Sequence, residues 1–216
     1  MKKIITIVFL YLSLLCHSQQ TNPNYDTTKV DRSKYYTSWE DAIWMPRRVV
    51  FLNLSFQQYD TISTLIGEMK NLEAFHMKGN FVKKIPSEIG NLRKLKVLNL
   101  ANNKISELPN SLCLLDSLTE LNLNNNSLYN LPENIGNLKN LKKLFLSNNS
   151  INKIPSSIGN LKKLEFLDLS ENNLDSLPSD IRLLTNLKTL DLSGNNINDH
   201  TKDIIKRFLQ TTKVIY

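Results

Sequence analysis

Few side chains in this sequence are of the types that catalyse reactions, and none has the neighbours that catalysis needs. After the first 18 residues the sequence holds two histidines, His76 and His200, and one cysteine, Cys113. A histidine base needs an orienting carboxylate or a nucleophile within hydrogen-bond reach. The sequence has no nucleophile motif, no zinc-type Cys/His spacing and no glycine-rich phosphate loop. We therefore predict a protein that is not an enzyme and needs no cofactor.

The elements that position the remaining polar residues are set by a repeat of 23 residues. This step links six asparagines: Asn80, Asn103, Asn126, Asn149, Asn172 and Asn195. It also links seven pairs of apolar residues: Leu52/Leu54, Phe75/Met77, Leu98/Leu100, Leu121/Leu123, Leu144/Leu146, Leu167/Leu169 and Leu190/Leu192. A Leu-Pro or Ile-Pro pair recurs at the same step from Ile85-Pro86 to Leu177-Pro178. A fixed period of this length indicates a solenoid with one turn per repeat.

Each part of the repeat has a physical reason. The two apolar residues of a pair point to one side of a strand, and the residue between them points to the other side. Stacked turns therefore place seven short strands in a parallel sheet, with the apolar pairs inside the coil. The asparagine amide at each bend can satisfy backbone groups of its own and neighbouring turns. The proline suits an irregular or short helical return rather than a second sheet.

One repeat has the order Leu141-x-x-Leu144-x-Leu146-x-x-Asn149-x-Ile151-x-x-Ile154-Pro155-x-x-Ile158-Gly159-x-Leu161. This order resembles the 23-residue class of the leucine-rich-repeat family, and the resemblance extends over residues 48–198. It implies an α/β solenoid, a curved horseshoe with a parallel sheet on the concave wall and irregular or short helical returns on the convex wall. It also implies that the concave sheet binds other macromolecules.

The outward positions of the strands are where we expect that binding. This face is polar in the first repeats and becomes aromatic and acidic in the later ones. Phe145 and Phe166 come from adjacent turns and could share one exposed patch that anchors a protein partner, although single surface aromatics are also common. We interpret His76 as a solvent-facing contact residue. The predicted protein-binding residues are His76, Asn99, Asn122, Lys143, Phe145, Phe166, Asp168 and Asp191.

Two of these residues raise the question of a metal site. Asp168 and Asp191 stand on adjacent predicted strands, about 5 Å apart. Carboxylates at this distance can recruit a cation. Calcium takes six or more oxygen ligands, and only Ser170, Ser193 and Glu171 are nearby. We therefore interpret the pair as solvated carboxylates and predict no metal site.

A basic flank follows the start of the turns, made of Lys70, Arg93, Lys94, Lys139, Lys162 and Lys163. It could contact an anionic polysaccharide, so a surface adhesin is the alternative to a protein-binding scaffold; the other interpretation is a solvated flank. The net charge is +7, and removal of Lys2 and Lys3 leaves +5. This excess is mild, and no aromatic residues alternate with the basic ones, so we expect no nucleic-acid partner.

The N-terminus has the order of a secretory signal peptide. Two lysines precede a nearly unbroken apolar run of about 12 residues, which is too short to span a bilayer, and we expect cleavage after Ser18. A lipoprotein anchored through Cys16 is the alternative. These features predict a secreted or cell-envelope protein that does not span the membrane, with residues 19–36 as a polar tether. Cys113 is then left without a disulfide partner, and we interpret it as a small apolar core residue.

Both ends of the repeat array are expected to carry caps, because a solenoid must cover its exposed end turns. At residues 37–47, Thr37 to Glu40 has the order of a capping box at the start of a short helix. Trp39 and Trp44 are expected to cover the first turn. At residues 199–216, we expect a helix capped by Asp199 and then a final strand. These caps resemble those of bacterial secreted leucine-rich-repeat proteins.

Overall fold

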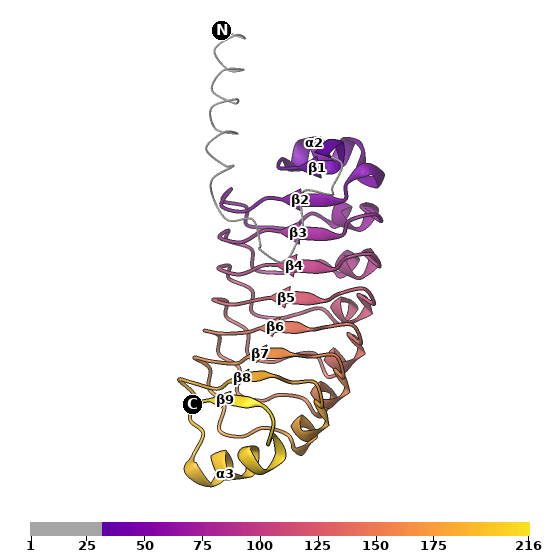
Figure 1. Ribbon diagram of the computed structural model, residues 1–216. Coiled ribbons are helices and arrows are strands. Elements are labelled where there is room, and N and C mark those ends of the chain that lie inside the picture. The colour runs from indigo at the N-terminus through magenta and orange to yellow at the C-terminus, as the bar shows by residue number, and fades with distance from the viewer. Residues whose placement is uncertain (1–31) are drawn as a thin grey trace. The chain divides into compact units, whose positions relative to one another are not determined.

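The computed structural model describes residues 32–216. Within residues 34–216, which form one unit, the strands build a single parallel sheet in sequence order (Figure 1). The strands are β1 (Tyr35–Tyr36), β2 (Phe51–Asn53), β3 (Ala74–His76), β4 (Val97–Asn99), β5 (Glu120–Asn122), β6 (Lys143–Phe145), β7 (Phe166–Asp168), β8 (Thr189–Asp191) and β9 (Lys213–Ile215). The expected signal peptide 1–18 and residues 19–31 of the expected tether lie outside the described residues.

The seven expected strands are β2 to β8, and their pairing confirms the predicted register. Leu121 of β5 pairs with Leu98 of β4 and with Leu144 of β6. All three leucines are fully buried. Each outward residue likewise pairs with the residue 23 positions later, so the sheet keeps its columns without a bulge.

Short 3₁₀ turns connect the strands and stack along one side of the sheet (Figure 1). They are η3 (Pro46–Arg48), η4 (Thr64–Glu68), η5 (Ser87–Asn91), η6 (Asn110–Leu114), η7 (Ile135–Asn137), η8 (Ser156–Asn160) and η9 (Ser179–Leu183), and a separate 3₁₀ turn, η2 (Arg32–Lys34), precedes β1. Pro86 precedes η5 with φ −68° and ψ 151°, an extended conformation that the proline ring favours. The α-helices among residues 32–216 are α2 (Trp39–Trp44) and α3 (Asp199–Phe208). In the described part of the chain, no helix has the length and apolar character needed to cross a membrane.

The 3₁₀ turns approach one another closely because small residues stand where they meet. A Cβ atom added to Gly136 would lie 2.1 Å from the carbonyl oxygen of Ser157 in the next turn, far inside van der Waals contact. One repeat earlier, the same position holds Cys113, which is buried and forms no disulfide. Burial raises the pKa of its thiol to about 11. The interpretation of Cys113 as a small apolar core residue is confirmed.

The asparagine column forms the predicted ladder. The Asn149 amide nitrogen donates to the carbonyl oxygens of Leu146 at 3.0 Å and of Leu123 at 3.1 Å. Its Oδ1 accepts from the backbone N–H of Leu128 at 3.0 Å. One side chain thus satisfies backbone groups in its own turn and in the preceding turn, and Asn103, Asn126, Asn172 and Asn195 repeat the pattern.

The N-terminal cap begins earlier in the chain than expected. Tyr35–Tyr36, which the sequence placed in the tether, forms β1 and pairs with β2. Helix α2 is capped one residue later than predicted, because the Ser38 hydroxyl accepts from the backbone N–H of Asp41 at 3.2 Å. Trp39 packs on the core as expected. Trp44 is 82% exposed, so the prediction that it covers the first turn is wrong; it points away from the core at the last residue of α2.

The C-terminal cap has the predicted helix and strand. The cap residue of α3 is Asn198 rather than Asp199, since the Asn198 Oδ1 accepts from the backbone N–H of Thr201 at 2.9 Å. Ile205 and Leu209 are buried against the last turn. Strand β9 then pairs with β8 and extends the sheet.

Candidate functional site

The later strands bring five of the predicted binding residues together on one face. Lys143 of β6 pairs with Phe166 of β7, Phe145 of β6 pairs with Asp168 of β7, and Asp168 pairs with Asp191 of β8. The Phe145 and Phe166 rings lie 5.1 Å apart between centroids, tilted by 42°. Both are only half-buried, although they flank fully buried leucines. We call Phe145 and Phe166 the aromatic pair.

The two aspartates beside the aromatic pair are held by their own turns. The Asp168 Oδ1 accepts from the backbone N–H of Ser170 at 3.1 Å and from its hydroxyl at 2.7 Å. The Asp191 Oδ1 accepts from Ser193 in the same way, at 3.0 and 2.7 Å. These bonds fix the carboxylates without neutralising them. Among the described residues, no cluster of His, Cys, Asp or Glu could hold a metal ion.

The remaining polar residues of the predicted face have mainly structural contacts. Asn99 and Asn122 stand at the position of the aspartates, and their Oδ1 atoms accept from the backbone N–H groups of Ala101 and Asn124. They lie on β4 and β5, so only Asn122 adjoins the aromatic pair, through its register with Phe145. The Lys143 ammonium lies 3.8 Å from a carboxylate oxygen of Glu120.

His76 does not face solvent as predicted. It is 7% exposed, and its ring lies 5.1 Å from the ring of Phe51, which stacks at 3.9 Å on Tyr35. Burial lowers the pKa of His76 to about 4, so the imidazole is neutral near pH 7. The interpretation as a solvent-facing contact residue is therefore wrong, and His76 belongs to a stack of rings on β1, β2 and β3.

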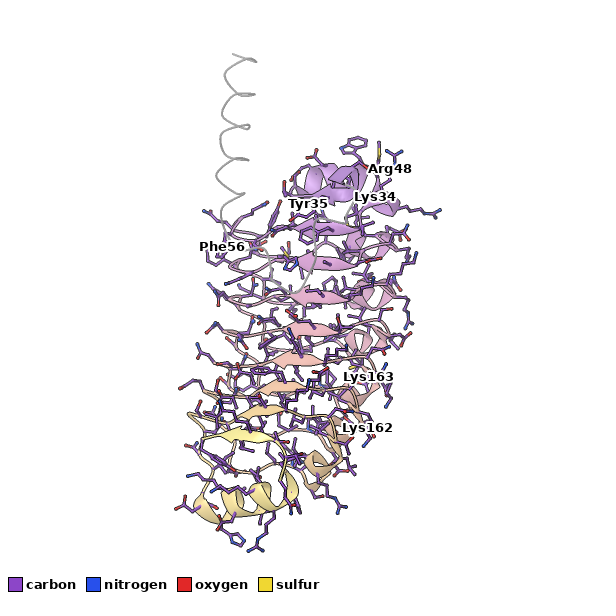
Figure 2. All side chains as sticks on the ribbon, in the orientation of Figure 1. Lys34, Tyr35, Arg48, Phe56, Lys162 and Lys163 are labelled. Atoms are coloured by element: carbon purple, nitrogen blue, oxygen red, sulfur yellow. The ribbon has the colours of Figure 1, made fainter. Side chains whose placement is uncertain are left out.

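The basic flank lies on the side where the strands begin, and several of its cations bind the neighbouring turn. Lys162 and Lys163 lie on this side, away from the edge that holds Phe56 (Figure 2). The contacts are Arg93 to Asp116 at 3.1 Å, Lys94 Nζ to Asn71 Oδ1 at 2.7 Å, Lys162 Nζ to the Leu183 carbonyl at 2.9 Å and Lys163 Nζ to Asn140 Oδ1 at 2.7 Å. Much of this charge thus links adjacent turns of the solenoid.

A shallow hollow of about 240 Å³ adjoins the starts of β6, β7 and β8. It is lined by Lys142, Lys163, Glu165, Asn186 and Lys188. The Lys188 ammonium contacts the Glu165 carboxylate at 2.5 Å. This contact, with the nearby charges of Lys142 and Lys143, lowers the pKa of Glu165. Three cations and one anion give the hollow a positive excess.

Comparison with known proteins agrees with this geometry. A family model described as a leucine-rich repeat region matches residues 47–146 and 133–206. The chain belongs to the leucine-rich-repeat family. A solved leucine-rich-repeat protein of Leptospira interrogans is 38% identical over 79% of this chain and 43% of its own, with a TM-score of 0.77. A plant peptide hormone receptor, solved in complex with its peptide, is 30% identical over 74% of this chain and 27% of its own, with a TM-score of 0.66. No curated protein was found to match the sequence.

The chain thus spans less than half the length of either of these two leucine-rich-repeat structures. Family membership accounts for the scaffold: parallel sheet, asparagine ladder and 3₁₀ returns. Members of this family are generally protein-binding scaffolds, and they are typically not enzymes. The outward residues of the strands differ between repeats of the same chain.

Sequence reasoning missed two features of the face. The hollow was detectable, because Lys142, Glu165 and Lys188 follow one another at the step of 23 residues in the column just before the strands. The stack of rings on β1, β2 and β3 was not detectable in the sequence, because Tyr35 precedes the first leucine-rich repeat and no periodic signal marks β1.

Proposed function

We propose that this protein is a non-enzymatic recognition scaffold that works outside the cytoplasm and binds a protein partner on the concave face of β5 to β8. The observation that carries the proposal is the aromatic pair. Two rings 5.1 Å apart stay half-buried on a sheet whose inward neighbours are completely covered. Large aromatic side chains on a rigid surface are the residues that most often dominate protein interfaces.

Rigidity is the second support. Leu144 and Leu167, which precede Phe145 and follow Phe166, are fully buried. The rings are therefore mounted on strands whose opposite face is packed core, and little conformational entropy remains to be lost when a partner binds. The plant receptor in the comparison was solved with a peptide bound, which agrees with ligand binding on this scaffold.

The location outside the cytoplasm rests on the N-terminal sequence. Lys2 and Lys3 precede an apolar run that ends in small residues, which is the order of an export signal. Mass analysis of the protein recovered from culture medium or envelope should find a chain that begins near Gln19. A chain lipid-modified at Cys16 supports the lipoprotein alternative, and an intact Met1 in the cytoplasm overturns export.

The binding proposal can be tested by capture from envelope and surface proteins. The full-length protein is compared with a double variant, Phe145→Asn with Phe166→Thr. These replacements are the residues that the same two columns hold in Asn122 and Thr189, so the variant should fold. We expect a captured protein to lose about 2 kcal/mol or more of binding free energy with the double variant.

The matched control is Phe81→Ala, which removes an exposed ring that lies elsewhere and contacts Lys104. A partner that binds wild type and both variants equally contradicts the proposal. Loss of binding only in Lys139→Glu with Lys162→Glu, at low salt, favours the anionic-polysaccharide adhesin instead.

A further inference from the structure

The surface around the aromatic pair is ordered by charge along the strand direction. Where the strands begin, Lys142, Lys163 and Lys188 surround the hollow, and only Glu165 offsets their charge. The half-buried rings of Phe145 and Phe166 follow. Positive charge therefore lies on one side of the aromatic pair over three adjacent turns.

Negative charge lies beyond Phe166 along the strands and level with Phe145. Asp168 pairs in register with Asp191, and neither forms an ion pair with any residue in the described part of the chain. Each aspartate uses one oxygen, Oδ1, to accept bonds from the serine two residues later. The second oxygen of each carboxylate is left for a ligand. The charge of this surface thus changes from positive to negative along the strand direction.

The spacing of the two charges matches an extended polypeptide. The column of Lys142 and Lys188 lies three residues before the column of Phe145, Asp168 and Asp191. Strands rise about 3.3 Å per residue, so the columns are about 10 Å apart. An extended segment lying along the strands has the same rise, and its side chains two or four positions apart point to the same face, about 7 or 13 Å apart, which brackets the distance between the two columns.

We infer that this surface binds an extended segment of the partner protein that places an acidic side chain over the hollow and a basic side chain over Asp168 and Asp191, two to four residues apart. An apolar side chain between them contacts the aromatic pair. The inference rests on the proposed function and adds the charge pattern and direction of the ligand. Complementary charge fixes the register of such a segment, and the apolar contact supplies most of its affinity.

The test is a selection of random linear peptides displayed on phage against the full-length protein at low salt. The enriched peptides should carry Asp or Glu two to four positions from Lys or Arg, with an apolar residue between them. Peptides synthesised from the enriched set are then titrated against three double variants, each checked for folding by circular dichroism.

Each variant removes one part of the surface. Lys142→Gln with Lys188→Gln should weaken binding of the peptides that carry the acidic and the basic residue about three- to tenfold, which is the scale of two partly exposed ion pairs. Asp168→Asn with Asp191→Asn should do the same; the amide keeps the turn bond, as Asn99 and Asn122 do. Replacing the acidic residue of the peptide by Gln should have no further effect on the lysine variant, because both changes remove the same interaction.

The matched control is Lys96→Gln, which lies in the column of Lys142 and Lys188 and pairs with Glu73 at 2.7 Å, two repeats before the hollow. It should bind the peptides like wild type. Enriched peptides without the charge pattern, or a pattern insensitive to both charge variants, overturn the inference, as does a selection that enriches nothing. When enriched peptides lack the charge pattern or are insensitive to the charge variants, Phe145→Asn with Phe166→Thr decides the proposed function: loss of peptide binding means that it stands, and unchanged binding means that both fail. When nothing is enriched, the capture experiment decides the proposed function.

Discussion

At the scale of single residues, the alternation along each strand separates folding from recognition. Leu144 and Leu146 point into the coil and are fully buried, while Phe145 between them is half-buried on the opposite face. Asp168 and Asp191 show a second separation, since one oxygen of each holds the local turn and the other does not. Substitutions at neighbouring positions should therefore affect different properties.

The alternation predicts unequal stability losses in one strand. Leu144→Ala should lower the free energy of unfolding by about 2–5 kcal/mol, because it leaves a cavity in the core. Phe145→Ala should cost much less, because its ring packs on the surface. Urea unfolding followed by circular dichroism measures both. Equal losses would show that Phe145 is a core residue.

His76 predicts a specific pH dependence. Its pKa is about 4 in the folded protein and near 6.5 when unfolded, so the unfolded chain takes up the proton first as the pH falls. The stabilising effect of the neutral ring is fully present above about pH 6.5 and is lost toward pH 4, by up to about 3 kcal/mol. His76→Asn should remove this part of the pH dependence in urea unfolding at pH 7 and pH 4.5. Parallel pH dependences of wild type and variant would contradict a neutral buried ring.

At the scale of elements, strands and returns are held together by side chains that bond to backbone. The Asn149 amide joins four backbone groups from two turns, and Gly136 lets two 3₁₀ turns meet backbone to backbone. These elements contain three to five residues each and have no stability of their own. The asparagine ladder and the close contact at Gly136 supply the stability that these short elements lack.

The ladder gives a prediction for one position and a control. Asn149→Ala should cost about 1–3 kcal/mol, because the Leu128 N–H loses its side-chain partner inside the coil and three carbonyl groups each lose one donor. Asn152→Ala, three residues later and exposed, should change stability little. Asn195→Ala should cost less than Asn149→Ala if the last turn opens locally. Urea unfolding midpoints of the three variants measure these losses of stability. A negligible effect of Asn149→Ala would show that the ladder does not stabilise the fold.

At the scale of the whole molecule, the solenoid is a series of nearest-neighbour contacts closed by two caps. Helix α2 and strand β1 cover one end, and helix α3 and strand β9 cover the other (Figure 1). In such an array each turn is stabilised by its immediate neighbours. A change at one end should therefore spread a short distance and then stop.

Removal of residues 199–216 tests this locality. The truncation uncovers β8 and the core residues beside Leu192, so amide hydrogen exchange should become faster over residues 189–192. Exchange over residues 97–100, four strands away, should change little, because each turn depends mainly on its neighbours. Uniformly faster exchange throughout the chain would instead indicate a single cooperative unit.

The sequence predicted the repeats well and the ends less well, for a physical reason. Inside the array, each position is specified several times over by its column, so the inward leucines and the asparagine ladder follow from the period. Trp44 and Tyr35 lie before the first repeat and belong to no column. A single tryptophan near a helix end looks the same in sequence whether it packs or protrudes. His76 belongs to a column, but its burial depends on Phe51 and Tyr35, which adjoin it only in space.

The unbroken register of the sheet also bears on how such a protein can evolve. Because every outward residue pairs with its counterpart one repeat later, duplication of a whole repeat would insert a strand, a return and a ladder asparagine that already fit their neighbours. The binding face could lengthen by such duplications while each new outward side chain diverged independently. Recognition can then change from one lineage to another at almost no cost to the scaffold.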